Sequence, residues 1–157
     1  MEVQRDKSGP IIYTICGSFR FIPEMFHAHH VLCQRGIMSF LPDFDLTQGI
    51  PTESTPFDPE AQKLHDAKID FTDGIYIINP GGYIGASTFY EWKKARSLGK
   101  RIYWYALDIL NDKEAMEVTR TLLASYDKAD KEIREELNNE SKKLMNLYVD
   151  CEEENDG

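Results

Sequence analysis

Residues 74–105 read GIYIINPGGYIGASTFYEWKKARSLGKRIYWY and contain a strand, a loop, a helix and a second strand. The run Gly74 to Ile78 is almost wholly apolar, which is typical of a strand buried on both faces of a sheet. A glycine-rich loop follows over residues 79–86. A helix is expected from about Ser87 to Leu98, because a glycine follows it, and Arg101 to Tyr105 form the next strand. This order predicts two parallel strands joined by a helical crossover.

The chain ahead of residue 74 repeats this alternation. Two short apolar runs, Ile11 to Cys16 and Ile37 to Leu41, predict strands. Helices are expected from Pro23 to about Arg35 and from Asp58 to Lys68, since proline is favoured in the first turn of a helix. Residues 43–57 hold many Asp, Thr, Ser, Gly and Pro residues and predict a long loop. We therefore expect an α/β domain with a parallel sheet of four to five strands and helices on both faces.

The pattern changes at residue 111, where charged residues with apolar positions at helical spacing begin. We assign residues 1–110 to the α/β domain. Residues 111–148 predict one or two amphipathic helices, which pack on this domain or on a partner subunit. The last residues, 149–157, are rich in acidic side chains and predict a disordered tail.

Charge and composition restrict the possible partners. The 157 residues carry a formal net charge of −9 and a pI near 4.9, which argues against binding a nucleic acid polymer or an anionic membrane surface. No apolar run approaches the length of a membrane span or of a signal peptide, so we expect a cytoplasmic protein. The three cysteines are widely spaced, which argues against a disulfide framework.

The histidine cluster of the first helix does not predict a metal site. His27, His30 and Cys33 recur every three residues, and such steps rotate around a helix without converging on one ion. We expect no metal and no cofactor. His65, on a later helix, could reach the loops at the strand ends, although a surface position is commoner. Cys16 is either a reactive thiol or, more simply, a small buried residue at the end of a strand.

Both loops that follow strands contain residues suited to an anion or a sugar. In the turn Gly17-Ser18-Phe19-Arg20 the glycine permits close backbone approach, the serine offers a hydroxyl, and the arginine can bind a phosphate through two hydrogen bonds. A tight turn with a solvent-facing arginine explains the same residues equally well. Loops after parallel strands lie at one edge of a sheet, so this turn and residues 79–86 should be neighbours.

The second loop leads to a glutamate with two interpretations. Gly82 and Gly85 permit close approach of a ligand, while Ser87 or Thr88 can cap the helix and also donate a hydrogen bond to a ligand oxygen. Glu91 can be the acid of a capping box with Thr88. Alternatively it projects into the crevice as a nucleophile, for which a glycosidic carbon is a suitable electrophile.

Two stretches resemble a known superfamily: IIYTICGSFR at residues 11–20 and LHDAKIDFTDGIYIINPGGYIGASTFYEWKKARSLGKRIYW at residues 64–104. They resemble the nucleoside 2-deoxyribosyltransferase-like superfamily, which includes the 2′-deoxynucleoside 5′-phosphate N-hydrolases. The resemblance covers roughly residues 11–105 and implies a flavodoxin-like or Rossmann-like fold. It implies that Glu91 is the nucleophile that attacks C1′ of a deoxyribose. It also implies that the first loop binds the 5′-phosphate and that Asp73 orients the sugar or the base.

The expected function follows from this resemblance. The chain is expected to cleave the N-glycosidic bond of a nucleoside or a deoxynucleoside 5′-phosphate, with water or a second base as acceptor. Well-studied transferases carry an aspartate at the position of Gly85, and its absence here favours hydrolysis. A module that binds or senses a nucleotide without cleaving it is the alternative. A homodimer or higher homo-oligomer is implied. The further residues expected to contact substrate are Asn79, Gly82, Gly85, Ser87 and Thr88.

Overall fold

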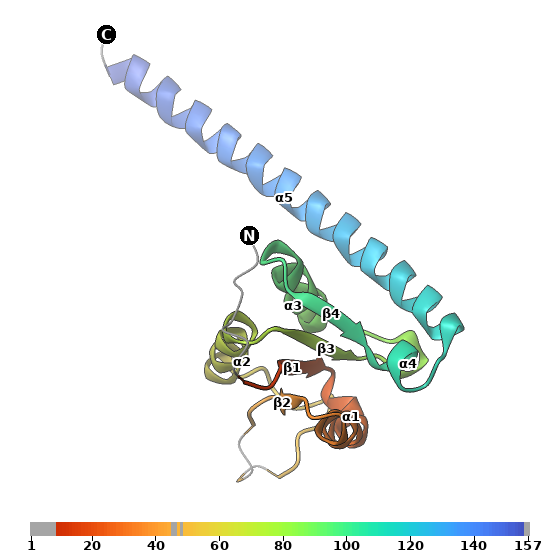
Figure 1. Ribbon diagram of the computed structural model, residues 1–157. Coiled ribbons are helices and arrows are strands. Elements are labelled where there is room, and N and C mark those ends of the chain that lie inside the picture. Colours follow the sequence, from red (N-terminus) through yellow and green to blue (C-terminus); the bar gives the residue numbers. More distant parts are fainter. Residues whose placement is uncertain (1–8, 45–46, 48, 156–157) are drawn as a thin grey trace. The chain divides into compact units, whose positions relative to one another are not determined.

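The computed structural model describes residues 9–44, 47 and 49–155 (Figure 1). The chain forms two compact units, Met1–Leu122 and Leu123–Gly157. The first unit contains a four-stranded sheet in which every strand is parallel to its neighbours, in the order β2-β1-β3-β4. The predicted α/β class and the parallel sheet are confirmed. The strands are β1 (Ile12–Gly17), β2 (Met38–Phe40), β3 (Gly74–Ile78) and β4 (Arg101–Trp104).

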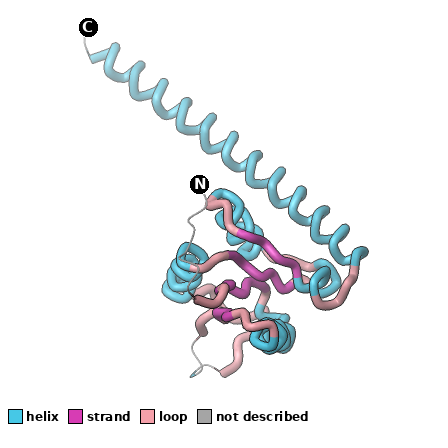
Figure 2. Tube along the Cα trace, in the orientation of Figure 1, coloured by secondary structure: helices cyan, strands magenta, loops and turns pink. Residues whose placement is uncertain are grey.

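Helices flank the sheet on both faces, and Figure 2 shows the strands enclosed between them. Helix α1 and the short helix α4 contact β3 on one face, and α2 and α3 contact β1 on the other or pack on each other. Two 3-10 turns, η1 and η3, stand in the loops after β1 and β3. The bounds are η1 (Phe19–Phe21), α1 (Ile22–Gln34), α2 (Pro59–Phe71), η3 (Pro80–Gly82), α3 (Ala86–Ser97) and α4 (Tyr105–Asp108).

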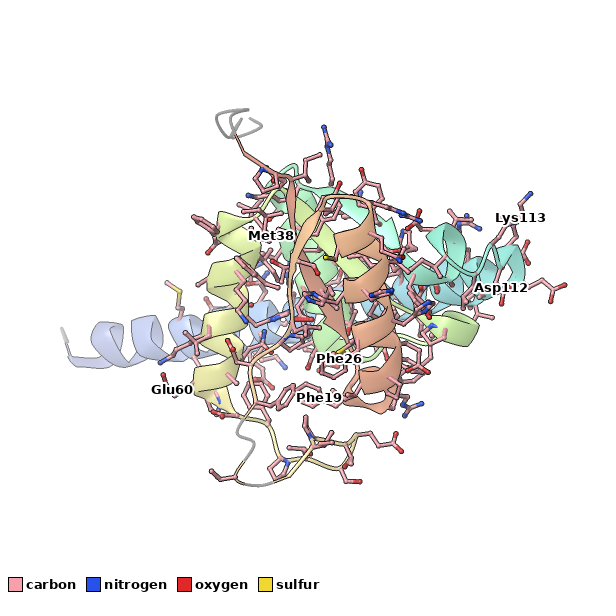
Figure 3. The ribbon with its side chains drawn as sticks, turned by 60° about the horizontal axis from the view of Figure 1, so that its bottom comes forward. Phe19, Phe26, Met38, Glu60, Asp112 and Lys113 are labelled. Carbon is pink, nitrogen blue, oxygen red and sulfur yellow. The ribbon has the colours of Figure 1, made fainter. Side chains whose placement is uncertain are left out.

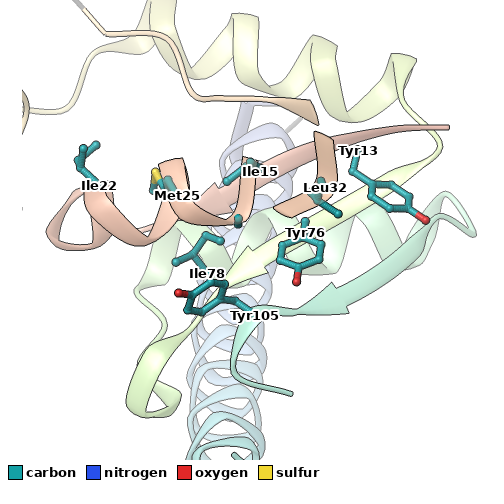
Figure 4. Packing of buried hydrophobic residues seen from close by; sticks show 9 residues of the cluster. Tyr13, Ile15, Ile22, Met25, Leu32, Tyr76, Ile78 and Tyr105 are labelled. Atoms are coloured by element: carbon teal, nitrogen blue, oxygen red, sulfur yellow. The ribbon is translucent and has the colours of Figure 1, made fainter. Parts of the chain in front are cut away.

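The core lies between the sheet and α1. Alternate residues of a strand point to opposite faces, so Tyr13 and Ile15 of β1 share one face with Tyr76 of β3 (Figure 4). Met25 and Leu32 of α1 pack against them, and both are almost fully buried. Burying a side chain of this size contributes about 1.5–3 kcal/mol. Thr14 and Cys16 of β1 point the other way and therefore face α2 and α3.

Local signals explain the helix boundaries. Asp58 caps α2, because its Oδ1 accepts hydrogen bonds from the backbone N–H groups of Glu60 and Ala61 at 3.0 and 3.4 Å. The helix then runs to Phe71, past the predicted end at Lys68. Figure 3 shows the side chains, with Glu60 at the start of α2. Helix α1 ends as predicted before a glycine, Gly36, which has a φ of 75°.

The C-terminal segment is one helix. Helix α5 spans Lys113–Asn155, 43 residues, and no proline or glycine interrupts it. The disordered tail predicted over residues 149–157 is corrected for residues 149–155, which continue α5 without a proline or glycine to end it. Residues 156 and 157 lie outside the described part. The boundary between the two compact units falls inside α5, so the first turns of this helix belong to the α/β unit.

Among the described residues, no helix combines the length and the apolar character needed to cross a membrane.

Candidate functional site

The two loops that follow β1 and β3 meet, as the parallel sheet predicts. The guanidinium carbon of Arg20 lies 3.8 Å from the centre of the Tyr83 ring, and the ring of Phe21 packs edge-on against the same tyrosine. Ser18 caps the 3-10 turn η1, because its Oγ accepts a hydrogen bond from the backbone N–H of Arg20 at 3.3 Å. An aromatic face and a cation therefore stand together at the carboxyl edge of the sheet.

Arg20 has a second partner in the long loop. Its Nη2 lies 2.6 Å from Oε2 of Glu53, and both side chains are substantially exposed. Phe19, next to Arg20, packs edge-on against Phe44 at the start of the same loop. A Cβ at Gly17 would lie 3.1 Å from Cβ of Ile78, so a side chain there would require its neighbour to shift by a few tenths of an ångström. The first loop is therefore bordered by Phe44 and Glu53 of the long loop.

The side chain of Asn79 has a structural role. It is completely buried, its amide nitrogen donates to Oγ1 of Thr119 at 2.9 Å, and its amide oxygen accepts from the backbone N–H of Ala106 at 2.9 Å. The predicted substrate contact is thus corrected to a structural role, because the side chain ties the end of β3 to α4 and to the start of α5. The sequence alone does not distinguish a buried asparagine at the end of a strand from an asparagine that binds a ligand there.

Gly82 is also required for packing. Its φ is 88°, and a Cβ there would lie 2.2 Å from the carbonyl oxygen of Ala115 and 2.6 Å from Cβ of Val118. The start of α5 therefore occupies the space that the sequence interpretation gave to a ligand. Gly85 differs, because a Cβ there would meet only Oη of Tyr83, at 3.7 Å.

The start of α3 has no side-chain cap. Gly85 holds the N-cap position, Ser87 is exposed in the first turn, and Thr88 is buried. The capping-box interpretation of Glu91 is therefore wrong, since Thr88 is not the N-cap residue and the glutamate stands more than a turn into the helix. Gly85, Ser87 and the first-turn N–H groups remain the ligand-facing candidates of this loop.

Glu91 instead contacts a histidine. Its Oε2 lies 3.0 Å from Nε2 of His65, and both side chains are buried. The same Nε2 lies 3.4 Å from Sγ of Cys16. The three residues come from α3, α2 and β1 and lie between the sheet and the two helices. His65 was expected to be a surface residue, but it shares the buried face of α2 with Ile69. The spacing of four residues between His65 and Ile69 is the sequence signal that could have predicted the burial of His65.

The thiol of Cys16 is neutral in this setting. Complete burial raises its pKa well above the ordinary value, and the carboxylates of Glu91 and Asp66 raise the pKa further. Sγ also lies 3.8 Å from the carbonyl oxygen of Thr14, which can accept a weak hydrogen bond from the thiol. A reactive thiolate nucleophile is therefore not what this environment favours.

The ligand atoms of Cys16, His65 and Glu91 lie within 4.8 Å of one another, a grouping that could hold a metal ion. A metal on Nε2 would leave the ring proton on Nδ1. That atom is buried without a hydrogen-bond partner among the described residues, whereas metal-bound histidines almost always donate this proton. The cluster therefore fits a set of hydrogen bonds better than a metal site.

Asp73 lies at the opposite edge of the sheet from this cluster. Its Oδ2 accepts a hydrogen bond of 2.7 Å from the backbone N–H of Ile12, at the amino ends of β1 and β3. Cys16 pairs with Ile77 near the carboxyl ends of the same strands. At about 3.3 Å per residue, the strands separate the two positions by more than 10 Å. Asp73 therefore lies far from Glu91, and the role in orienting the sugar or the base that the resemblance implies does not fit this position.

Neither a protein-family model nor a curated protein matches this sequence.

Proposed function

We propose that the protein cleaves the N-glycosidic bond of a deoxynucleoside 5′-phosphate or a nucleoside, with the Glu91 carboxylate as nucleophile. The observation that carries the proposal is the placement of Glu91, which is buried beneath the carboxyl ends of β1 and β3 and contacts His65 at 3.0 Å. Glu91 does not cap its helix, and it lies next to the two loops that contain residues suited to a ligand. Helix stability therefore does not explain this carboxylate. The resemblance of residues 11–105 to the deoxyribosyltransferase-like superfamily supports the same role.

The chemistry proceeds in two steps. An oxygen of Glu91 forms a bond to C1′ as the C1′–N bond breaks, and the departing base takes a proton from water. A second water then attacks C1′, the ester bond to Glu91 breaks, and the attacking water loses its proton to solvent. The products are the free base and the sugar or sugar phosphate, and the carboxylate is restored. A second base in place of water would make the protein a transferase.

The first loop supplies the site for a phosphate. Arg20 is exposed and held on Tyr83, and Ser18 stands beside it at the carboxyl edge of the sheet. A bound phosphate would replace the carboxylate of Glu53 on the guanidinium, since an arginine binds a phosphate through two hydrogen bonds. We assign the contact with the sugar to Gly85 and Ser87, and the uncapped start of α3 supports this assignment.

The alternative is a module that binds or senses a nucleotide without cleaving it. Two observations favour it: Glu91 is almost fully enclosed, and Asp73 is too distant to assist a leaving base. A binding module needs the two loops but not the reactivity of the carboxylate.

The deciding experiment follows base release from a panel of deoxynucleotides and nucleosides by chromatography. The wild-type protein is expected to release base, and Glu91→Gln, which keeps the size of the side chain, is expected to lose at least 100-fold of kcat with binding retained in calorimetry. Equal inertness of both proteins, with tight nucleotide binding, would contradict catalysis and support the binding module.

We also propose a cytoplasmic homodimer or higher homo-oligomer. Along α5, Ile133, Leu137 and Leu144 are more than half exposed, and their spacing of four and seven places them on one face of the helix. A second copy of the chain can bury such a face. Light scattering coupled to size exclusion measures the mass directly, and a monomer would contradict this assembly.

A further inference from the structure

We infer that His65 is the positioning residue of the site, and that its imidazole orients the Glu91 carboxylate through an Nε2–H hydrogen bond. The inference rests on the proposed function for its catalytic consequence. The contact itself is independent of that function, since the two atoms lie 3.0 Å apart between buried side chains of α2 and α3.

The tautomer of His65 follows from the atoms around its two ring nitrogens. Nδ1 is buried without a hydrogen-bond partner among the described residues. A proton on Nδ1 would be an unsatisfied buried donor, and it would leave the Nε2 lone pair facing the carboxylate. A proton on both nitrogens would also leave the Nδ1–H donor unsatisfied. A single proton on Nε2, donated to Glu91, leaves no unsatisfied donor and is the tautomer that these contacts favour.

Cys16 completes the geometry without adding charge. Its Sγ lies 3.4 Å from Nε2 of His65 on the side of β1, and burial keeps the thiol protonated. The imidazole is therefore confined between the strand and the carboxylate. A neutral sulfur at this distance does not compete with Glu91 for the Nε2 proton as a thiolate would.

This arrangement has two consequences for the reaction. A fixed carboxylate can meet C1′ in one geometry, and a misplacement of about 1 Å can cost on the order of 100-fold in rate. The same hydrogen bond stabilises the carboxylate when it departs from C1′ in the second step. Both effects act on kcat, because His65 is enclosed behind Glu91 and does not contact the substrate.

The test compares His65→Gln with His65→Leu. The amide nitrogen of glutamine can occupy the place of Nε2 and donate the same hydrogen bond, whereas leucine cannot. We expect His65→Leu to lower kcat about 100-fold with KM within about threefold, and His65→Gln to recover at least tenfold of that loss. His29→Gln is the matched control, since His29 also makes one hydrogen bond, to Oγ of Ser39 at 2.6 Å, but lies on α1 outside the site.

A second measurement reads the hydrogen bond without any activity. Nitrogen-15 NMR of histidine-labelled protein at neutral pH is expected to show His65 as the neutral Nε2–H tautomer, and Glu91→Ala is expected to shift that proton signal. Detection of an imidazolium or of the Nδ1–H tautomer would overturn the inference, as would an unchanged kcat in His65→Leu. An inactive wild-type protein that shows the Nε2–H signal would refute the proposed function while supporting the hydrogen bond.

Discussion

At the scale of single residues, one buried contact determines which chemistry the site can perform. Cys16, His65 and Glu91 come from distant parts of the sequence, and each alone has an ordinary explanation as a core, surface or capping residue. Together they bring a neutral thiol, an imidazole and a carboxylate within 4.8 Å of one another. The neutral thiol is a poor nucleophile, which is why the proposed function gives the reactive role to the carboxylate.

The raised pKa of the Cys16 thiol makes stability depend on alkaline pH. An unfolded thiol ionises near pH 8.5, whereas burial keeps the folded thiol protonated to higher pH. Above about pH 8.5 the unfolded chain has lost a proton that the folded chain retains, so the free energy of unfolding falls as pH rises. Burial also raises the pKa of Tyr13 to about 12, so ionisation of this tyrosine in the unfolded chain lowers the free energy of unfolding further at higher pH. Urea unfolding from pH 7 to 10 measures the decline.

Substitution of single cysteines tests whether Cys16 causes the loss of stability at alkaline pH. Cys16→Ala is expected to flatten the decline between pH 8.5 and 10, whereas Cys33→Ala is expected to leave it unchanged because Cys33 is exposed. Iodoacetamide should modify Cys33 and spare Cys16 in the folded protein. Modification of both at equal rates would contradict the buried environment of Cys16.

At the scale of secondary-structure elements, the start of α5 packs against the loop after β3. Gly81 and Gly82 both have positive φ, 66° and 88°, but only Gly82 lacks space for a side chain. Gly81→Ala is expected to cost about 1–2 kcal/mol through backbone strain alone. Gly82→Ala is expected to cost several kcal/mol more, because it also collides with Ala115 and Val118.

Chemical denaturation of these two variants separates backbone strain from collision. Equal losses of unfolding free energy in Gly81→Ala and Gly82→Ala would show that α5 does not approach the loop this closely. The amide hydrogens of the first turns of α5 should also exchange faster in Gly82→Ala, since this end of the helix must move away.

Most elements could be predicted from the sequence because a strand buried on both faces is a continuous apolar run. Gly74–Ile78 was predicted with its observed bounds for that reason. The site was predicted only in part. Glu91 and the meeting of the two loops followed from the parallel sheet, but the contact with His65 depends on how α2 and α3 pack. The role of Asp73 came only from the resemblance, and the structure places this residue a whole strand away from the cluster.

At the scale of the whole molecule, the sheet and its site lie in one compact unit and most of α5 lies in another. A chain that ends at Lys128, just past the boundary between the units, is expected to keep its fold. The same truncation removes the exposed face of Ile133, Leu137 and Leu144, so the proposed oligomer should become a monomer. Circular dichroism and light scattering measure the two outcomes, and an unfolded truncation would contradict the independence of the first unit.

The ion pair between Arg20 and Glu53 means that Glu53 competes with an incoming anion for the guanidinium of Arg20. Under the proposed function, an incoming anion exchanges with a carboxylate instead of meeting an unoccupied cation. An exposed pair of this kind is worth about 0.2–1 kcal/mol, which lowers affinity by no more than about fivefold. A doubly charged phosphate that forms two hydrogen bonds exceeds this threshold easily. Under the proposed function the ion pair therefore lowers the affinity for every anion by the same small factor, and the charge and hydrogen bonds of the anion itself decide which one binds.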